Sequence, residues 1–173
     1  MAPSMEQLQE IFQPHQFGIN EQYVNLYHVY DDLSRTPYQH GIGIECEDPD
    51  IYFMNAWHVI TPSAIGKHLN WCNKAPTQFM SFYNNLKTAR CEQYRRCNQT
   101  YVHDVGYRRP ESVRIAHVRL PRNTNVWAFL HEEMLGMMGT FGAGLEMSRI
   151  SDPSELFVWW GVPDECVQNR HLL

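Results

Sequence analysis

Three polar residues stand within or beside strongly apolar segments of this sequence. They are His28 in NLYHVYD, Ser81 in QFMSFYNN and Glu155 in PSELFVWW. A polar group in such a segment is destabilising unless it is paired, and a common reason for its presence is that it lines a cleft. The pattern raises the hypothesis that an imidazole, a hydroxyl and a carboxylate face one pocket.

Each of these residues also has a purely structural interpretation. A histidine in a strand is often a hydrogen-bonded core residue, a serine before a helix is often its cap, and a glutamate at the start of a strand is often solvated. Five further histidines lack the spacing of metal ligands, so we predict no metal site: His58, His68, His103, His117 and His131. No Gly-X-Ser-X-Gly motif occurs, and no cysteine has the context of a known nucleophile.

The elements that must position these residues follow from apolar periodicity and capping signals. We expect strands over 22–31, 77–83, 112–120 and 155–162, helices over 63–71, 84–97 and 125–139, and loops over 31–50 and 142–154. The second helix is capped by Asn84 or Asn85. Strands and helices do not alternate regularly, so the sequence predicts the α+β class rather than a doubly wound sheet.

The chain has 173 residues, an aromatic share of 13% and a net charge of −5 at pH 7. These values are typical of one folded domain, which we place at 22–173 after a polar N-terminal arm or short helix at 1–21. No apolar run has the length of a signal peptide or a membrane span. Five cysteines without a Cys-X-X-Cys pair indicate neither a zinc knuckle nor a disulfide framework.

From these features we expect a soluble, cytoplasmic protein without membrane contact. A secreted effector is the alternative if a signal peptide was removed. Nine of the fourteen lysines and arginines lie between Lys87 and Arg122. This basic segment is either a solvated helix face with strand edges or a site for anionic phosphates, and the second interpretation includes a nucleic-acid partner.

The three segments together resemble the ADP-ribosyltransferase family, in particular the cholera- and pertussis-toxin-like group and related fungal domains. The family has a basic residue on its first strand, here His28 after Leu26-Tyr27. A serine-containing motif before a helix follows, here Phe79-Met80-Ser81-Phe82-Tyr83. The third motif is a glutamate, an apolar strand and Gly-Ile-Pro, here Glu155 followed by Gly161-Val162-Pro163.

The resemblance implies a fold of split mixed β-sheets with flanking helices, and NAD as the substrate. Glu155 would stabilise positive charge on the ribose while the bond to nicotinamide breaks. Ser81 would orient Glu155 or the ribose, and His28 would contact the adenosine side. Tyr27, Phe82 or Tyr83 would pack on the nicotinamide ring.

Two departures from the family pattern bear on activity. Pro153 stands where the family has the acid or glutamine that helps to select the acceptor, and Ser81 is the one hydroxyl kept of three in the second motif. The acceptor of ADP-ribose is therefore open between a protein, a small molecule and water. A catalytically inactive interaction module on the same fold, an effector-like binding protein, is the alternative function.

Overall fold

The computed structural model of the chain describes residues 22–47, 62–69, 76–121, 126–140 and 154–169. The expected arm at 1–21 and nearly all of the expected loop at 142–154 lie outside these ranges. The strands are β1 (Tyr23–Tyr30), β2 (Tyr38–Gln39), β3 (Gly43–Glu45), β4 (Phe79–Tyr83), β5 (Tyr101–Val102), β6 (Gly106–Tyr107), β7 (Arg114–Pro121), β8 (Trp127–Leu130), β9 (Glu155–Trp159), β10 (Gly161–Pro163) and β11 (Val167–Asn169). The α-helices are α3 (Pro62–Leu69), α4 (Leu86–Asn98) and α5 (His131–Thr140).

The strands form one large sheet, one small sheet and a hairpin. The large sheet has the order β11-β7-β1-β4-β9-β8, the small one the order β10-β3-β2, and β5 pairs with β6. Helices and sheets are both present, which confirms the α+β class. Every strand pair in the described ranges is antiparallel, so the expectation of mixed sheets is wrong for this part of the chain.

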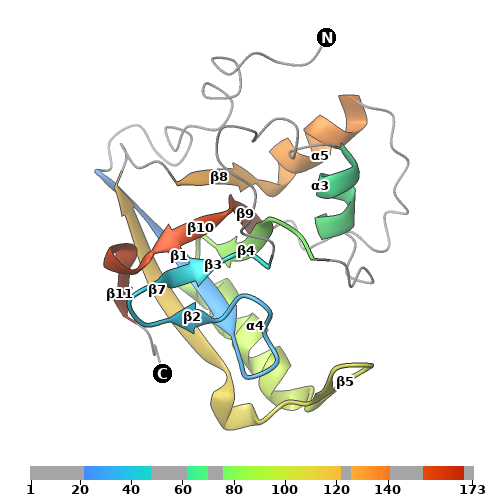
Figure 1. Cartoon of the computed structure of the whole chain (residues 1–173), viewed down its shortest axis with the longest axis vertical. Helices are drawn as coiled ribbons and strands as arrows, with labels where there is room; N and C mark the ends of the chain where they lie inside the picture. Colours follow the sequence, from blue (N-terminus) through green and yellow to red (C-terminus); the bar gives the residue numbers. More distant parts are fainter. Residues whose placement is uncertain (1–21, 48–61, 70–75, 122–125, 141–153, 170–173) are drawn as a thin grey trace.

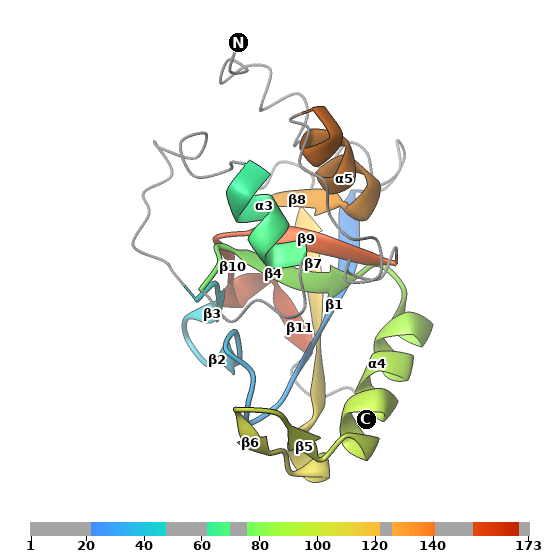
Figure 2. The ribbon, with the colours of Figure 1, turned by 90° about the vertical axis from the view of Figure 1, so that its right-hand side faces the viewer.

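The large sheet is covered differently on its two faces (Figures 1 and 2). The small sheet packs against one face, which we call the sheet-covered face; its core includes Leu26, Phe82 and Leu156 from the large sheet with Ile44 and Val162 from the small one. Helices pack against the other, the helix-covered face. Burial on both faces explains why the central strands are so uniformly apolar.

Two separate apolar clusters cover the helix-covered face. Under α3 and α5, Ile65 and Met134 pack against Phe157 on β9. Under α4, Ala89 packs against Val29 on β1 and other residues of β4 and β7. Figure 2 shows α3 and α5 at one end of the sheet and α4 at the other. The helical cover is therefore divided, and the middle of this face is left between the two clusters.

Several predicted elements are confirmed with small shifts of their ends. The strands expected over 22–31, 77–83 and 112–120 are β1, β4 and β7, and the helices expected over 63–71 and 84–97 are α3 and α4. Asn85 is the cap of α4, since its side chain accepts a hydrogen bond of 2.8 Å from the amide of Lys87. Clear alternation and a clear cap made these segments predictable.

The expected helix over 125–139 is wrong in its first third. Residues 127–130 form β8, which pairs with β9, and only then does α5 begin at His131. Trp127, Ala128 and Phe129 are all buried, so both faces of this strand are covered. An apolar run without alternation has no period that separates a strand from a helix.

The expected single strand over 155–162 is two strands in two sheets. The break is Trp160, whose φ of 71° is left-handed. Its amide donates to the carbonyl of Gln78 over 2.8 Å, and its carbonyl accepts from the amide of Cys46 over 2.9 Å. These two bonds hold a backbone conformation that is strained for a tryptophan, and they redirect the chain from β9 into β10.

The expected loop over 31–50 contains two strands, β2 and β3, of the small sheet. Gly43 has φ of 109°, and a side chain there would collide with the backbone of Val162 on β10. Glycine is therefore required for β3 to approach β10. The turn signals of this segment were visible in the sequence, but the partner strand lies far away in the chain.

The connection after β1 depends on a buried ion cluster at Asp31. Its side chain is fully buried, lies 3.0 Å from Arg96 of α4 and 3.0 Å from Arg108, and accepts a hydrogen bond of 2.9 Å from the amide of Leu33. Asp31 therefore ties the end of β1 to α4 and to the segment after β6. The neighbouring Asp32 pairs with an arginine on the surface.

Asp31→Ala should lower the free energy of unfolding by about 3 kcal/mol, because it removes the buried carboxylate that pairs with the half-buried Arg108 and leaves Arg96 with Glu92 as its remaining acidic partner. Urea denaturation measures this loss. Asp32→Ala is the matched control and should change stability little, since exposed ion pairs contribute little. Equal losses for the two variants would show that the cluster at Asp31 does not organise this region.

Candidate functional site

Glu155 is the first residue of β9, and it lies on the helix-covered face in the gap between the two apolar clusters. Its side chain is buried, with 7% of its surface exposed. The antiparallel register places Tyr83 opposite Glu155 and Ser81 opposite Phe157, so all four side chains share this face. The Ser81 hydroxyl donates to Oε2 of Glu155 over 3.4 Å, and the Tyr83 hydroxyl donates to Oε1 over 3.3 Å.

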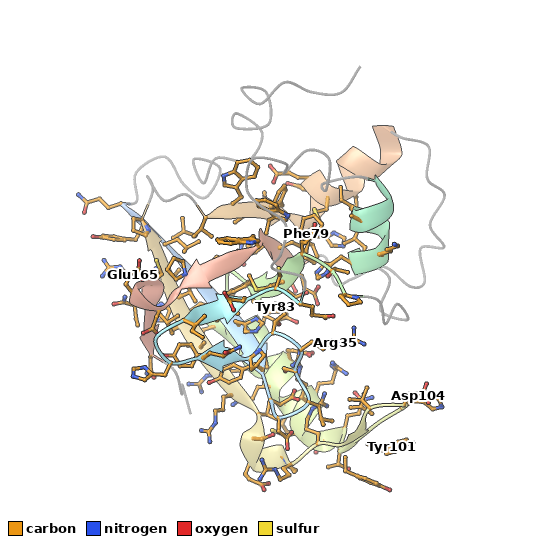
Figure 3. The ribbon with its side chains drawn as sticks, viewed as in Figure 1. Arg35, Phe79, Tyr83, Tyr101, Asp104 and Glu165 are labelled. Carbon is orange, nitrogen blue, oxygen red and sulfur yellow. The ribbon has the colours of Figure 1, made fainter. Side chains whose placement is uncertain are left out.

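These three residues line a cleft of about 460 Å³. The cleft is bounded by α3, by α4, by the loop after β1 and by the β5–β6 hairpin, whose Tyr101 and Asp104 are labelled with Tyr83 in Figure 3. The divided helical cover explains why an opening exists here. Helices α3 and α5 cover one part of the sheet face, and α4 covers another. The polar side chains of Ser81, Tyr83 and Glu155, which we call the polar row, lie between the two parts.

The cleft carries more positive than negative side chains. Five basic side chains line it: Arg35, Lys67, Arg95, Arg96 and Arg108. Three acidic side chains do so as well: Glu47, Glu92 and Glu155. Arg35 pairs with Glu47 over 3.0 Å, and Glu92 pairs with Arg95 and Arg96. Among the described residues, Lys67 on α3 forms no ion pair and is exposed.

His68 of α3 joins the polar row around Glu155. Its Nε2 lies 3.5 Å from the Ser81 hydroxyl, and its Nδ1 lies 2.7 Å from the hydroxyl of Thr77. The ring packs between the aromatic rings of Phe79 and Phe157, with centroid distances of 5.5 and 5.2 Å. This burial lowers the pKa of His68 to about 4, so the imidazole is neutral near pH 7.

Tyr83 keeps its proton for the hydrogen bond to Glu155. Burial raises the pKa of the Tyr83 phenol, and the nearby negative charge of Glu155 raises it further. A phenol that stays protonated can only donate to an ionised carboxylate. Glu155 thus has one hydroxyl donor beside each of its two oxygens, at the long distances of 3.4 and 3.3 Å.

His28 and Phe82 lie on the sheet-covered face, opposite Glu155. Phe82 is fully buried in the core there, and the His28 ring packs against it at a centroid distance of 4.8 Å. The two nitrogens of His28 lie 2.8 Å from the carbonyl oxygen of Ser81 and 2.7 Å from that of Thr36. Burial lowers the pKa of His28, although both carbonyl contacts favour the protonated ring.

Of the six side chains predicted for the site, the structure therefore brings three into the cleft. Glu155, Ser81 and Tyr83 line it. Tyr27 lies in the same cross-strand row as Tyr83, but its ring stacks on His117 at 5.1 Å and does not line the cleft. His28 and Phe82 are on the other face, where direct contact with a ligand beside Glu155 is not supported.

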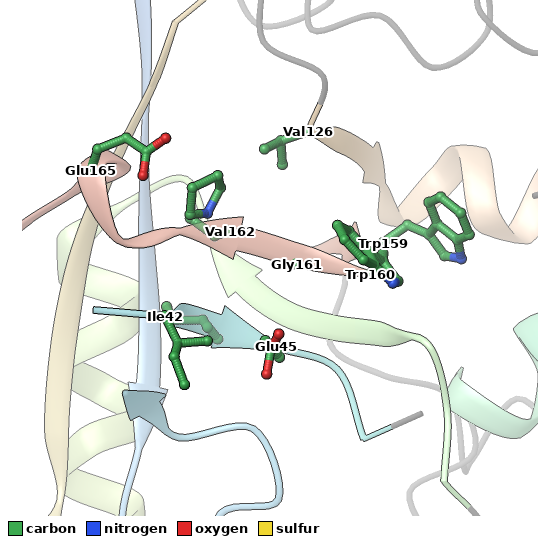
Figure 4. Close-up of a pocket in the computed structure, with 10 residues that line it drawn as sticks. Ile42, Glu45, Val126, Trp159, Trp160, Gly161, Val162 and Glu165 are labelled. Atoms are coloured by element: carbon green, nitrogen blue, oxygen red, sulfur yellow. The ribbon is translucent and has the colours of Figure 1, made fainter. Parts of the chain in front are cut away.

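A second, larger cavity of about 690 Å³ lies along β10 and away from this row (Figure 4). Its lining is mostly apolar and includes Ile42, Val126 and Trp160, with Glu45 and Glu165 among its members. Trp160 is 42% exposed here while Trp159 is buried, so the two adjacent tryptophans differ. None of the six predicted site residues lines this cavity.

In the described ranges, no three His, Cys, Asp or Glu side chains are grouped in a way that could hold a metal ion. No helix of the described part is long and apolar enough to cross a membrane. No family model, curated protein or solved structure matches this chain.

Sequence reasoning missed the roles of His68, Thr77 and Arg35 in the cleft. A signal for His68 was present, because it shares the predicted apolar face of its helix with Ile65 and Leu69, and a polar residue there needs a partner. Arg35 gave no such signal, because it belongs to a segment predicted as a loop. Arg95, Arg96 and Arg108 lie in the basic segment for which a phosphate site was one of the two interpretations.

Stability should fall in acid partly because of His68. Its folded-state pKa of about 4 lies below the ordinary value of 6.5, so the unfolded chain binds a proton first as the pH falls. Its contribution is therefore full above pH 6.5 and lost between pH 6.5 and 4, by at most about 3 kcal/mol. His68→Gln should show a shallower loss, measured by urea denaturation from pH 7 to 5. Parallel curves for the two proteins would contradict this environment for His68.

Proposed function

We propose that this protein cleaves the bond between nicotinamide and ribose in NAD and passes ADP-ribose to an acceptor or to water. The observation that carries the proposal is the cleft in which Glu155, held by Ser81 and Tyr83, lies beside several basic side chains. Glu155, Ser81 and Tyr83 are among the residues that the resemblance to ADP-ribosyltransferases singles out, whereas His28 and Phe82 lie on the other face of the sheet. The cavity of about 460 Å³ also has the size of ordinary ligand pockets.

Cleavage of NAD requires stabilisation of positive charge on the ribose. The C1′–N bond breaks, and its electron pair returns to the nicotinamide nitrogen, which becomes neutral. C1′ then takes a lone pair from an oxygen or nitrogen of the acceptor, whose proton is released. A carboxylate fixed beside C1′ interacts more strongly with the oxocarbenium-like transition state than with the ground state, so it accelerates the step.

The remaining lining suits the rest of the substrate. The pyrophosphate of NAD carries two negative charges, and basic side chains favour phosphate oxygens. Lys67 stands on α3 at one wall of the cleft and forms no ion pair among the described residues. This cation supports a substrate with phosphate groups, and the neutral His68 adds no further charge beside the ribose.

A non-catalytic interaction module is the second candidate, and a specific observation favours it. His28 does not face the cleft, since both its nitrogens contact carbonyl oxygens of the protein. Three tyrosines are also strongly exposed at the end of the molecule formed by α4 and the β5–β6 hairpin: Tyr94, Tyr101 and Tyr107. Exposed tyrosines are typical anchors of protein interfaces.

The hypothesis of a nucleic-acid partner loses support from the ion pairs. Arg95, Arg96, Arg108 and Arg109 of the basic segment all pair with acidic side chains. Arginines that are already neutralised contribute less to binding of a phosphate backbone. The described part of the segment is better characterised as a set of ion pairs than as a basic track.

Glu155→Gln should reduce the release of nicotinamide from NAD by about 100-fold or more, because it removes the charge that stabilises the transition state. Chromatography of reactions with purified protein measures nicotinamide and ADP-ribose directly. Glutamine has nearly the same shape, and its carbonyl oxygen can accept a hydrogen bond from one of the two hydroxyls while its amide group donates to the oxygen of the other, so the variant should keep its melting temperature.

Glu165→Gln is the matched control, since Glu165 is an exposed acid outside this cleft, and it should release nicotinamide at the wild-type rate. No release by the wild-type protein would refute the proposal and favour the interaction module. Full turnover by the Glu155 variant would show that the reaction does not use this carboxylate.

A further inference from the structure

The hydroxyl of Ser81 has one proton but two hydrogen-bonding neighbours in the cleft. Its Oγ lies 3.4 Å from Oε2 of Glu155 and 3.5 Å from Nε2 of His68. An ionised carboxylate can only accept a hydrogen bond, whereas a neutral imidazole nitrogen either donates or accepts. The direction of the Ser81 hydroxyl therefore depends on which nitrogen of His68 carries the proton.

Two arrangements satisfy all the donors. With the proton on Nε2, Thr77 donates to Nδ1, His68 donates to Ser81, and Ser81 donates to Glu155. With the proton on Nδ1, His68 donates to Thr77, and Thr77 donates to the carbonyl of Phe79. Ser81 then donates to Nε2 of His68 instead of to Glu155. Glu155 then loses one of its two hydroxyl donors.

Geometry and charge both favour the first arrangement. The hydroxyl of Thr77 is 2.7 Å from Nδ1 of His68 but 3.4 Å from the carbonyl oxygen of Phe79, so its proton is better used on His68. A hydrogen bond to an ionised carboxylate is also stronger than one to a neutral nitrogen. The first arrangement gives Ser81 that stronger acceptor.

We propose that His68, as the Nε2–H tautomer, is a positioning residue that turns the hydroxyl of Ser81 toward Glu155. The chain of donors then runs from Thr77 through His68 and Ser81 to Glu155, where Tyr83 donates to the other oxygen. For its catalytic consequence this inference rests on the proposed function. His68 itself contacts neither oxygen of the carboxylate.

The surroundings of the ring keep it in this form. Phe79 and Phe157 enclose it, and burial among them opposes a second proton. The charged and titratable groups near it are Lys67 on the same helix, Glu155 and Tyr83 across the cleft, and His131, whose ring centroid lies 6.2 Å from that of Phe157. The ring stays neutral through the pH range of the test below.

The tautomer can be measured without any turnover. In protein labelled with ¹⁵N-histidine, two-bond ¹H–¹⁵N correlations at pH 7 should show His68 with a protonated Nε2 and an unprotonated Nδ1, assigned by loss of its signals in His68→Gln. A protonated Nδ1 with a bare Nε2, or a doubly protonated ring, would overturn the proposal. This result stands or falls separately from NAD cleavage.

Kinetics test the positioning role. His68→Phe should lower kcat about tenfold with little change in KM, the effect of one lost hydrogen bond. His68→Gln can still donate to Ser81 and should retain most of the activity. If wild-type protein cleaves NAD and His68→Phe keeps its full kcat, the positioning role is refuted. If no protein cleaves NAD, the proposed function fails, and the tautomer alone decides the hydrogen-bond chain.

Thr77→Val provides an independent test in case a His68 variant does not fold. It removes the donor to Nδ1 and leaves His68 in place, so the nitrogen spectrum should move toward a mixture of tautomers, and kcat should fall in proportion to the lost Nε2–H form. An unchanged tautomer in this variant would contradict the role assigned to Thr77.

Discussion

The antiparallel register between β4 and β9 is the constraint on which the candidate site depends. It pairs Tyr83 with Glu155 and Phe82 with Leu156, so the polar row and the apolar core fall on opposite faces. A slip of one residue would reverse every side chain, and it would place the carboxylate of Glu155 in the core under the small sheet. Apolar packing on both faces of the sheet therefore determines on which face the carboxylate of Glu155 lies.

The cleft exists because the helices leave part of this sheet face uncovered. One cluster lies under α3 and α5 and another under α4, and the opening between them exposes the row that contains Ser81 and Glu155 to a cleft. Helix α3 contributes His68 and Lys67 to one wall of the cleft, and α4 contributes ion-paired arginines to the other. A buried polar row is stable only if its members satisfy one another, and the hydroxyls of Ser81, Tyr83 and Thr77 meet that need.

Local sequence patterns were sufficient to predict some elements. The alternation of β1 and the asparagine cap of α4 predicted this strand and this helix correctly. Strand β8 was taken for a helix since burial on both faces removes the alternation, and the turn at Trp160 depends on bonds to Gln78 and Cys46 that lie far away in the chain. The adjacency of Ser81 and Glu155 was anticipated from the family resemblance. The position of His28 on the opposite face was not anticipated, because the sequence of a strand that is covered on both sides does not indicate which face meets the cleft.

A crystal structure of the Glu155→Gln variant with NAD would report the ligand, the cleft and the position of residue 155 together. We expect NAD in the cleft between α3 and α4, with the ribose that carries nicotinamide within hydrogen-bond distance of residue 155 and Ser81. NAD bound instead in the cavity beside Trp160, or a cleft that stays empty at saturating NAD, would contradict this expectation.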